Sequence, residues 1–312
     1  MCTIKQKMEQ RLLTQSAAVM GTIGIAGLAL GILSDSRAVL ADGLFSCLAV
    51  IIKLLMLGTS RLISKETSVR FQFGYWQMEP LVLFTEGVFT MFVVAYAAAA
   101  GVQGILAGGR DVDFGLAVYY GLFFMIMSAG FYTHLKRQNR KLKSNLVHFD
   151  NVSWYIDLVL AAGLMVSFAA AWALAQTGYG AYARYADPLI MLVLSLHMAV
   201  PAYRILAPSF RQILGAAPAE LHERVQQVMD ESLARYGFKD YVSSVQQYGN
   251  TKIIEIDILL GRDFPAQTVE ELDAIRESID EKLGYPDSQQ WLTINFTASR
   301  RWMARDYLLN EP

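Results

Sequence analysis

Four ionisable side chains lie inside long apolar runs of the sequence, where a charge is difficult to accommodate. Asp42 and Lys53 belong to the second run, Glu86 to the third and Asp157 to the fifth. An ionised group at the middle of a bilayer costs about 2.5–3.5 kcal/mol on insertion scales, so each of these residues is a candidate for function. A structural role is the alternative for the aspartates, because pairing with Lys53 can also retain a carboxylate in an apolar run.

The spacing of the polar residues predicts two helix faces that are rich in oxygen ligands. Asp42 and Ser46 are spaced i, i+4 in the second run, which places them on one face of a helix. Asp150, Ser153 and Asp157 are spaced i, i+3, i+7 at the fifth run and share a face in the same way. Carboxylate, hydroxyl and water oxygens suit hard cations such as Mg²⁺ or Mn²⁺ better than soft ones.

These faces predict a divalent metal site and a path leading to it. The predicted ligands are Asp42, Ser46, Ser153 and Asp157. The residues predicted on the path from the cytoplasm are Asp150, Glu86 and Lys53. Alternatives exist for all three path residues: Asp150 can be a solvated residue at a helix start, and Lys53 can extend its side chain to the membrane surface. Glu86 can simply neutralise the ammonium group of Lys53.

Six apolar segments predict a membrane domain over residues 1–207. About 20 mainly apolar residues are needed to cross roughly 30 Å of hydrocarbon. The segments that qualify are 12–33, 38–60, 80–107, 114–135, 152–175 and 185–206. Of the 312 residues, 54% are hydrophobic and only 18% are charged, whereas a typical soluble domain has about 25% charged residues. No cleavage motif follows the first segment, so we expect it to be retained as a span.

Basic residues in the short loops predict the orientation of these spans. Lysine and arginine are concentrated before the first segment, after the second and after the fourth, while each remaining loop has one, at Arg37, Arg110 and Arg184. Short cytoplasmic loops carry the excess of basic residues, so both termini are expected in the cytoplasm. The expected location of the protein is the cytoplasmic membrane. The net charge of −1 gives no sign of a nucleic-acid partner.

Residues 208–312 have the composition of a soluble domain and predict a cytosolic α+β fold. Amphipathic helices are expected at 218–236 and 269–283, and strands at 241–248, 253–259 and 291–296. The order αββαβ predicts a three-stranded sheet packed against two helices. The domain has one histidine, His222, and no cysteine, so a tight transition-metal site within it is not expected.

Four stretches of the chain, in the same order, resemble motifs of the cation diffusion facilitator family. Residues 36–46, SRAVLADGLFS, are similar to its second-span segment, and residues 71–79, FQFGYWQME, to its loop motif H-x-F-G-H-G-K-x-E. Residues 144–157 resemble its fifth-span segment, and residues 212–221 the start of its tail. The resemblance implies a six-helix transmembrane bundle with a cytosolic metallochaperone-like αββαβ domain. It also implies exchange of divalent cations for protons and a homodimer joined through the tail.

The same resemblance implies which residues bind the transported cation. The family uses four ligands, two from the second span and two from the fifth, and the matching positions are Asp42, Ser46, Ser153 and Asp157. Two of the ligands are hydroxyls here, and the histidine that accompanies zinc selectivity is absent. The loop histidines are replaced by Phe71 and Tyr75, so the peripheral metal site of the family is not expected.

The combined interpretation is a proton-coupled exporter of a divalent metal cation. Mg²⁺, Mn²⁺ and Fe²⁺ fit the oxygen ligands better than Zn²⁺. The metal is the transported substrate, and no permanently bound cofactor is expected. No catalytic motif predicts an enzyme. The alternative is a relative that no longer transports and acts as a membrane scaffold or regulator through its cytosolic tail, because two ligands and the loop site have been lost.

Overall fold

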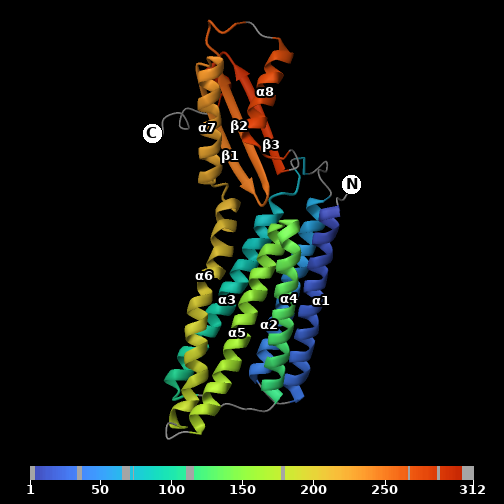
Figure 1. The fold of residues 1–312 in the computed structure, drawn as a ribbon, viewed down its shortest axis with the longest axis vertical. Helices are drawn as coiled ribbons and strands as arrows, with labels where there is room; N and C mark the ends of the chain where they lie inside the picture. Colours follow the sequence, from blue (N-terminus) through green and yellow to red (C-terminus); the bar gives the residue numbers. More distant parts are fainter. Residues whose placement is uncertain are drawn as a thin grey trace. The chain divides into compact units, whose positions relative to one another are not determined.

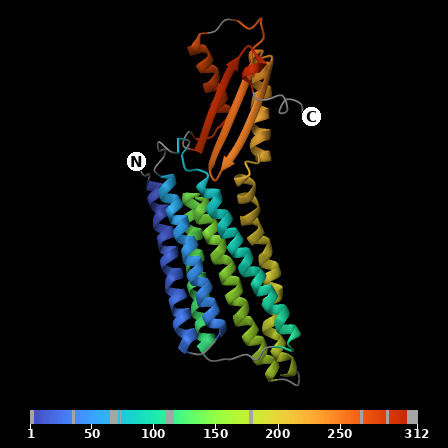
Figure 2. The same ribbon diagram turned by 180° about the vertical axis from the view of Figure 1, so that it is seen from behind.

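The structure, a computed structural model, describes residues 4–33, 37–64, 71–72, 74–109, 116–176, 180–265, 268–286 and 289–303. The chain divides between Phe210 and Arg211 into two units, which Figures 1 and 2 show from opposite sides. The long helices of the first unit are α1 (Ile4–Leu33), α2 (Arg37–Ile63), α3 (Met78–Leu106), α4 (Leu116–Leu142), α5 (Asn145–Ala175) and α6 (Ala186–Ile213). A 3₁₀ helix, η1 (Gly180–Tyr185), precedes α6. Parts of the predicted loops, at 34–36, 65–70, 110–115 and 177–179, lie outside the described residues.

Five of the described helices are long and apolar enough to cross a membrane. They are α1, the part of α2 from Asp42, α3, most of α5 and the Tyr182–Ile213 stretch that contains α6. The sequence predicts six spans, and helix α4 does not meet this requirement over its described residues. Its apolar part is interrupted by the tyrosines and the histidine at Tyr119, Tyr120, Tyr132 and His134. Over the described residues the membrane unit therefore has the six expected helices, five of which are long and apolar enough to cross a membrane.

Glycines allow α1 and α2 to approach closely. A Cβ atom at Gly27 of α1 would lie 2.8 Å from the Cα of Gly43 on α2 and 2.6 Å from the hydroxyl oxygen of Tyr120 on α4. A Cβ at Gly43 would lie 2.5 Å from the backbone nitrogen of Leu28. Small residues permit such backbone contact between membrane helices. The contact places Tyr120 next to Asp42 on α2.

Helix α3 packs against both α6 and α5. A Cβ at Gly87 would lie 2.9 Å from the Cα of Leu206, and the rings of Phe84 and Phe210 stack with centroids 5.6 Å apart. A small buried cluster continues this contact to α5, and its members are Val94, Ile156, Met198 and Ala202. The packing of α3 thereby sets the position of Glu86 relative to α5.

The start of α5 is fixed by side-chain hydrogen bonds at the α4–α5 turn. Ser144 is the N-cap, and its hydroxyl accepts a hydrogen bond from the backbone N–H of Val147, which satisfies one of the free donors of the helix. The amide of Asn139 donates to the carbonyl of Ser144 and accepts from its backbone N–H. The polar face with Asp150, Ser153 and Asp157 begins less than two turns after this cap.

The second unit has the predicted αββαβ order. Helix α7 (Ala219–Tyr236) is followed by β1 (Asp240–Tyr248), β2 (Thr251–Leu259), α8 (Val269–Leu283) and β3 (Gln290–Thr297). Strand β2 is central, antiparallel to β1 and parallel to β3. Thr268 and Glu271 form a capping box at the start of α8. The core joins both helices to the sheet through residues that include Val225, Met229, Ile254, Ile256, Ile279 and Ile294.

Candidate metal site

Lys53 and Asp150 form a buried ion pair between α2 and α5. The ammonium group contacts Oδ1 of Asp150, and the two side chains are 3% and 0% exposed. The ammonium nitrogen also lies 4.9 Å from the ring centroid of Trp154, a distance at which the ring attracts a cation. The sequence left two alternatives, that Lys53 extends to the membrane surface and that Asp150 is solvated. Both are wrong, because both side chains are buried. The neutralising partner of Lys53 is Asp150 rather than Glu86. Pairing depends on the direction in which each helix turns its side chains as well as on the depth of the residues in the membrane.

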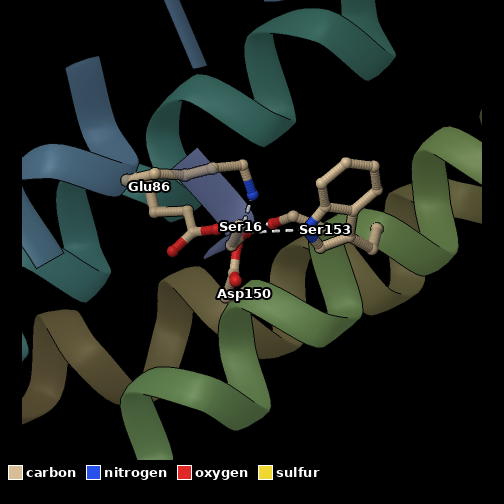
Figure 3. A network of polar contacts seen from close by, with 6 residues as sticks. Ser16, Glu86, Asp150 and Ser153 are labelled. Atoms are coloured by element: carbon tan, nitrogen blue, oxygen red, sulfur yellow. Dashed lines mark hydrogen bonds and ion pairs between the residues drawn. The ribbon is translucent and has the colours of Figure 1, made fainter. Parts of the chain in front are cut away.

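Glu86, on α3, instead forms a hydrogen bond with Ser153 on α5. The hydroxyl of Ser153 donates a hydrogen bond of 2.6 Å to Oε1 of Glu86. The indole N–H of Trp154 donates one of 2.8 Å to the hydroxyl of Ser16 on α1. Figure 3 shows Ser16 of α1, Glu86 of α3, and Asp150 and Ser153 of α5 lying close to one another. Four helices are therefore joined by one polar cluster inside the membrane unit.

A small cavity adjoins this cluster. Its volume is about 40 Å³, and one water molecule needs at least about 10–15 Å³ on this measure. The cavity can hold a metal ion with part of its hydration shell. Its lining combines apolar side chains with polar ones from α2, α3 and α5, and the polar side chains are Lys53, Glu86, Thr90, Ser153 and Asp157.

The four predicted ligands are divided between this cavity and a second position. Ser153 and Asp157 line the cavity, whereas Asp42 and Ser46 do not. Oδ2 of Asp42 accepts a hydrogen bond of 2.7 Å from the hydroxyl of Tyr120, which also lies beside Ser46. Asp157 is within electrostatic range of Asp42, so the two positions are neighbours. Among the residues that the structure describes, no three His, Cys, Asp or Glu side chains are grouped closely enough to hold a metal ion.

The path residues predicted from the sequence lie at the cavity or beside it. Lys53 and Glu86 line it, and Asp150 is held against Lys53. Charge is therefore concentrated at one place: Glu86 is within electrostatic range of Lys53, Asp150 and Asp157. Such a grouping in an apolar environment is stable only where opposite charges, hydrogen bonds or a bound ion compensate one another.

Tyr120 and Trp154 are functional candidates that the sequence reasoning missed. Both are amphipathic aromatic residues, whose hydroxyl or N–H group takes a hydrogen-bond partner when it is buried. A signal was present for Trp154, because it lies one turn after Asp150 and directly follows Ser153. For Tyr120 the signal was weaker, since its partner Asp42 lies on a helix far away in the sequence.

Comparison with known proteins shows the family to which the chain belongs. Residues 13–214, well over half of the chain, match the family model of the cation efflux transmembrane domain. Protein p34 of Rickettsia rickettsii (strain Sheila Smith) is 19% identical over 213 residues, which cover 67% of this chain and 67% of that protein. The matched region of the family model contains every residue of the polar cluster.

Proposed function

The chain belongs to the cation efflux, or cation diffusion facilitator, family of metal cation transporters, and from this premise we propose that it exports a divalent cation in exchange for protons. The proposed ligands during transport are Asp42, Ser46, Ser153 and Asp157. The observation that carries the proposal is the cavity lined by Ser153 and Asp157, with Asp42 within electrostatic range of Asp157. Ionisable groups inside a membrane unit mark ion pathways, because they are costly there without a role.

The chemistry of the ligands favours a hard or borderline cation. The proposed set contains two carboxylates and two hydroxyls, with neither thiolate nor imidazole. Oxygen ligands suit Mg²⁺ and Mn²⁺, and Fe²⁺ is also compatible with them, while Zn²⁺ prefers sites that include nitrogen or sulfur. Mg²⁺ and Mn²⁺ commonly keep some of their water, for which the cavity has room.

Proton exchange follows from the carboxylates in this proposal. An ionised aspartate binds the cation, and once the cation leaves, a bare carboxylate in a water-poor cavity is unfavourable. Uptake of a proton from the opposite side removes that charge and resets the site. Each exported cation is thereby coupled to inward movement of protons.

The remaining features of the proposal concern assembly and location. We place the chain in the cytoplasmic membrane with both termini and the αββαβ unit in the cytoplasm, which is supported by the basic residues of the predicted cytoplasmic loops. The family resemblance supports a homodimer joined through this unit. A transport-inactive scaffold is the competing interpretation, and the following experiment separates the two.

The test is metal transport by the purified chain in proteoliposomes under a pH gradient. Mn²⁺, Mg²⁺, Fe²⁺ and Zn²⁺ are offered separately, and internal metal and internal pH are both recorded. We expect transport of at least one of the first three, with proton counterflow, and a loss of at least about 10-fold in Asp157→Asn and Asp42→Asn. Glu223→Gln is the control that should transport normally, because the side chain of Glu223 is exposed on α7. If no metal is transported, the scaffold interpretation replaces the transporter.

A further inference from the structure

We propose that the cation binds in the cavity with Glu86 as a direct ligand, beside Ser153 and Asp157, and that Lys53 is held beside this position as half of a neutral pair with Asp150. Asp42 is not a ligand in this state of the protein. The inference rests on the proposed function and deepens it, because it names the ligands that hold the cation when the helices are arranged as described. It assigns to Glu86 a role as a resident ligand rather than a residue of the path alone.

The first support is an unsatisfied carboxylate oxygen at the cavity. Glu86 is 3% exposed and lines the cavity, and Ser153 satisfies only its Oε1 atom. Oε2 is buried, and among the described residues no side chain or backbone group forms a hydrogen bond with it. A buried acceptor without a partner costs about 1–3 kcal/mol, and more when it is charged. A cation in the adjoining space would supply the missing interaction.

The second support is the balance of charge around the cavity. Glu86, Asp150 and Asp157 provide three carboxyl groups within electrostatic range of one another, and Lys53 provides one ammonium. When all four groups are ionised, two negative charges remain. One divalent cation neutralises them, whereas a monovalent cation leaves a net charge inside the membrane unit. The Lys53–Asp150 pair is neutral, so the two remaining negative charges are those of Glu86 and Asp157, and they match a cation of charge two.

Lys53 also lines the cavity, and its positive charge would oppose a cation there. The structure compensates that charge in two ways. Asp150 accepts the ammonium group directly, and the face of the Trp154 ring lies below it. The indole is itself held in place by its hydrogen bond to Ser16. Lys53 is thereby retained at a fixed position as half of a neutral pair, so its repulsion of the cation is reduced.

The third support is the position of Asp42. This carboxylate accepts the hydroxyl hydrogen bond of Tyr120 and is absent from the lining of the cavity. Thr90 of α3, by contrast, lines the cavity one turn beyond Glu86. Two carboxylates, the hydroxyls of Ser153 and Thr90 and water therefore form the ligand set. This set fits a six-coordinate hard cation, and it contains too few carboxylates to form a cluster of three acidic residues.

The decisive experiment measures equilibrium binding of Mn²⁺ to the full-length chain in lipid nanodiscs, by electron paramagnetic resonance of the free ion. Glu86→Gln removes the charge but keeps the size and an acceptor for Ser153. We expect it to weaken Mn²⁺ binding by at least about 10-fold. Glu79→Gln is the matched control, a glutamate that is 8% exposed on the same helix but does not line the cavity. Its affinity should equal that of the unmodified chain.

Glu86→Asp keeps the carboxylate and provides a second variant if Glu86→Gln does not fold. It should bind Mn²⁺ with an affinity between those of the unmodified chain and Glu86→Gln. Normal Mn²⁺ affinity in Glu86→Gln, combined with weak binding in Asp42→Asn and Asp157→Asn, overturns this inference and leaves the proposed function standing. An unmodified chain that binds no Mn²⁺, and transports none of the four metals, overturns both.

Discussion

Lys53 and Asp150, 97 residues apart in the sequence, form an ion pair that is almost fully buried between α2 and α5. Removing one member of a buried pair leaves an uncompensated charge, whereas replacing both with apolar residues is often neutral or stabilising. This relationship makes the pair accessible to a test by single and double substitution.

We predict that Lys53→Met lowers the free energy of unfolding by about 3–5 kcal/mol, because Asp150 then remains buried without its counter-ion. The double variant Lys53→Met, Asp150→Leu should recover most of this loss. Thermal unfolding in detergent, followed by circular dichroism, measures both. A double variant that is less stable than Lys53→Met alone would contradict the pairing. Because the pair is neutral, the double variant should also bind Mn²⁺.

A second prediction concerns the hydrogen bond from Tyr120 to Asp42. Tyr120→Phe removes a hydrogen bond to an acidic group, which we expect to cost about 1.5–3 kcal/mol if the carboxylate is ionised. Tyr119→Phe is the matched control, because the side chain of Tyr119 lies next to Tyr120 in the sequence but is 71% exposed. Unfolding temperatures of the two variants provide the comparison. Equal temperatures would show that the Tyr120 hydroxyl makes no net contribution.

The contact between α1 and α2 gives a third prediction. Gly27→Ala places a methyl group within 2.8 Å of Gly43 and within 2.6 Å of the Tyr120 hydroxyl, so the helices must separate. We expect a loss of about 1–3 kcal/mol in stability, as for other overpacked sites. Gly58→Ala on α2 is the control, since no atom lies within 4 Å of the added carbon. That control should be neutral or slightly stabilising. Equal stability of the two variants would contradict the close contact.

A fourth prediction concerns the pH dependence of the αββαβ unit. Burial, and the hydrogen bond from the Tyr241 hydroxyl to Asp230, raise the pKa of Tyr241 above its ordinary value of 10.0. Because the folded state favours the protonated phenol, this contribution to stability is complete below about pH 10 and is lost as the pH rises further. We expect Tyr241→Phe to flatten the dependence of stability on pH between about 10 and 11.

The measurement for Tyr241 is denaturant unfolding of the full-length chain at a series of pH values, followed by the fluorescence of its tryptophans. Tyr248→Phe is a suitable control, because its hydroxyl bonds to Gln246 rather than to an acidic residue. Its pH profile should match that of the unmodified chain. A Tyr241→Phe profile identical to both would indicate that the phenol does not titrate differently in the folded state.

The fold could be predicted closely from the sequence, and the side-chain partners could not. Apolar length and periodicity are local properties, so the long helices and the αββαβ order follow from them. Pairing depends on helix rotation, which tertiary packing decides. For that reason depth alone suggested Glu86 as the partner of Lys53, while the structure joins Lys53 to Asp150.

The spacing rules placed residues on shared faces without showing how those faces meet. Asp150, Ser153 and Asp157 do lie at one polar cluster with its cavity, as their spacing on α5 predicts. Asp42 and Ser46 do not line the cavity, and both lie beside the hydroxyl of Tyr120, which comes from a third helix. A pattern within one segment cannot reveal a side chain supplied by another.

The hydrogen bond between Ser153 and Glu86 has a consequence for movement as well as for binding. It ties α3 to α5 through Oε1 of the same carboxyl group that borders the cavity. Whatever draws this carboxyl group away from Ser153 loosens the two helices, and whatever separates the helices frees the carboxyl group. Linkage requires that the effect of the carboxyl group on helix separation and the effect of helix separation on the carboxyl group be equal in free energy. A change at the Glu86 carboxyl group that weakens this bond is therefore expected to favour separation of α3 from α5.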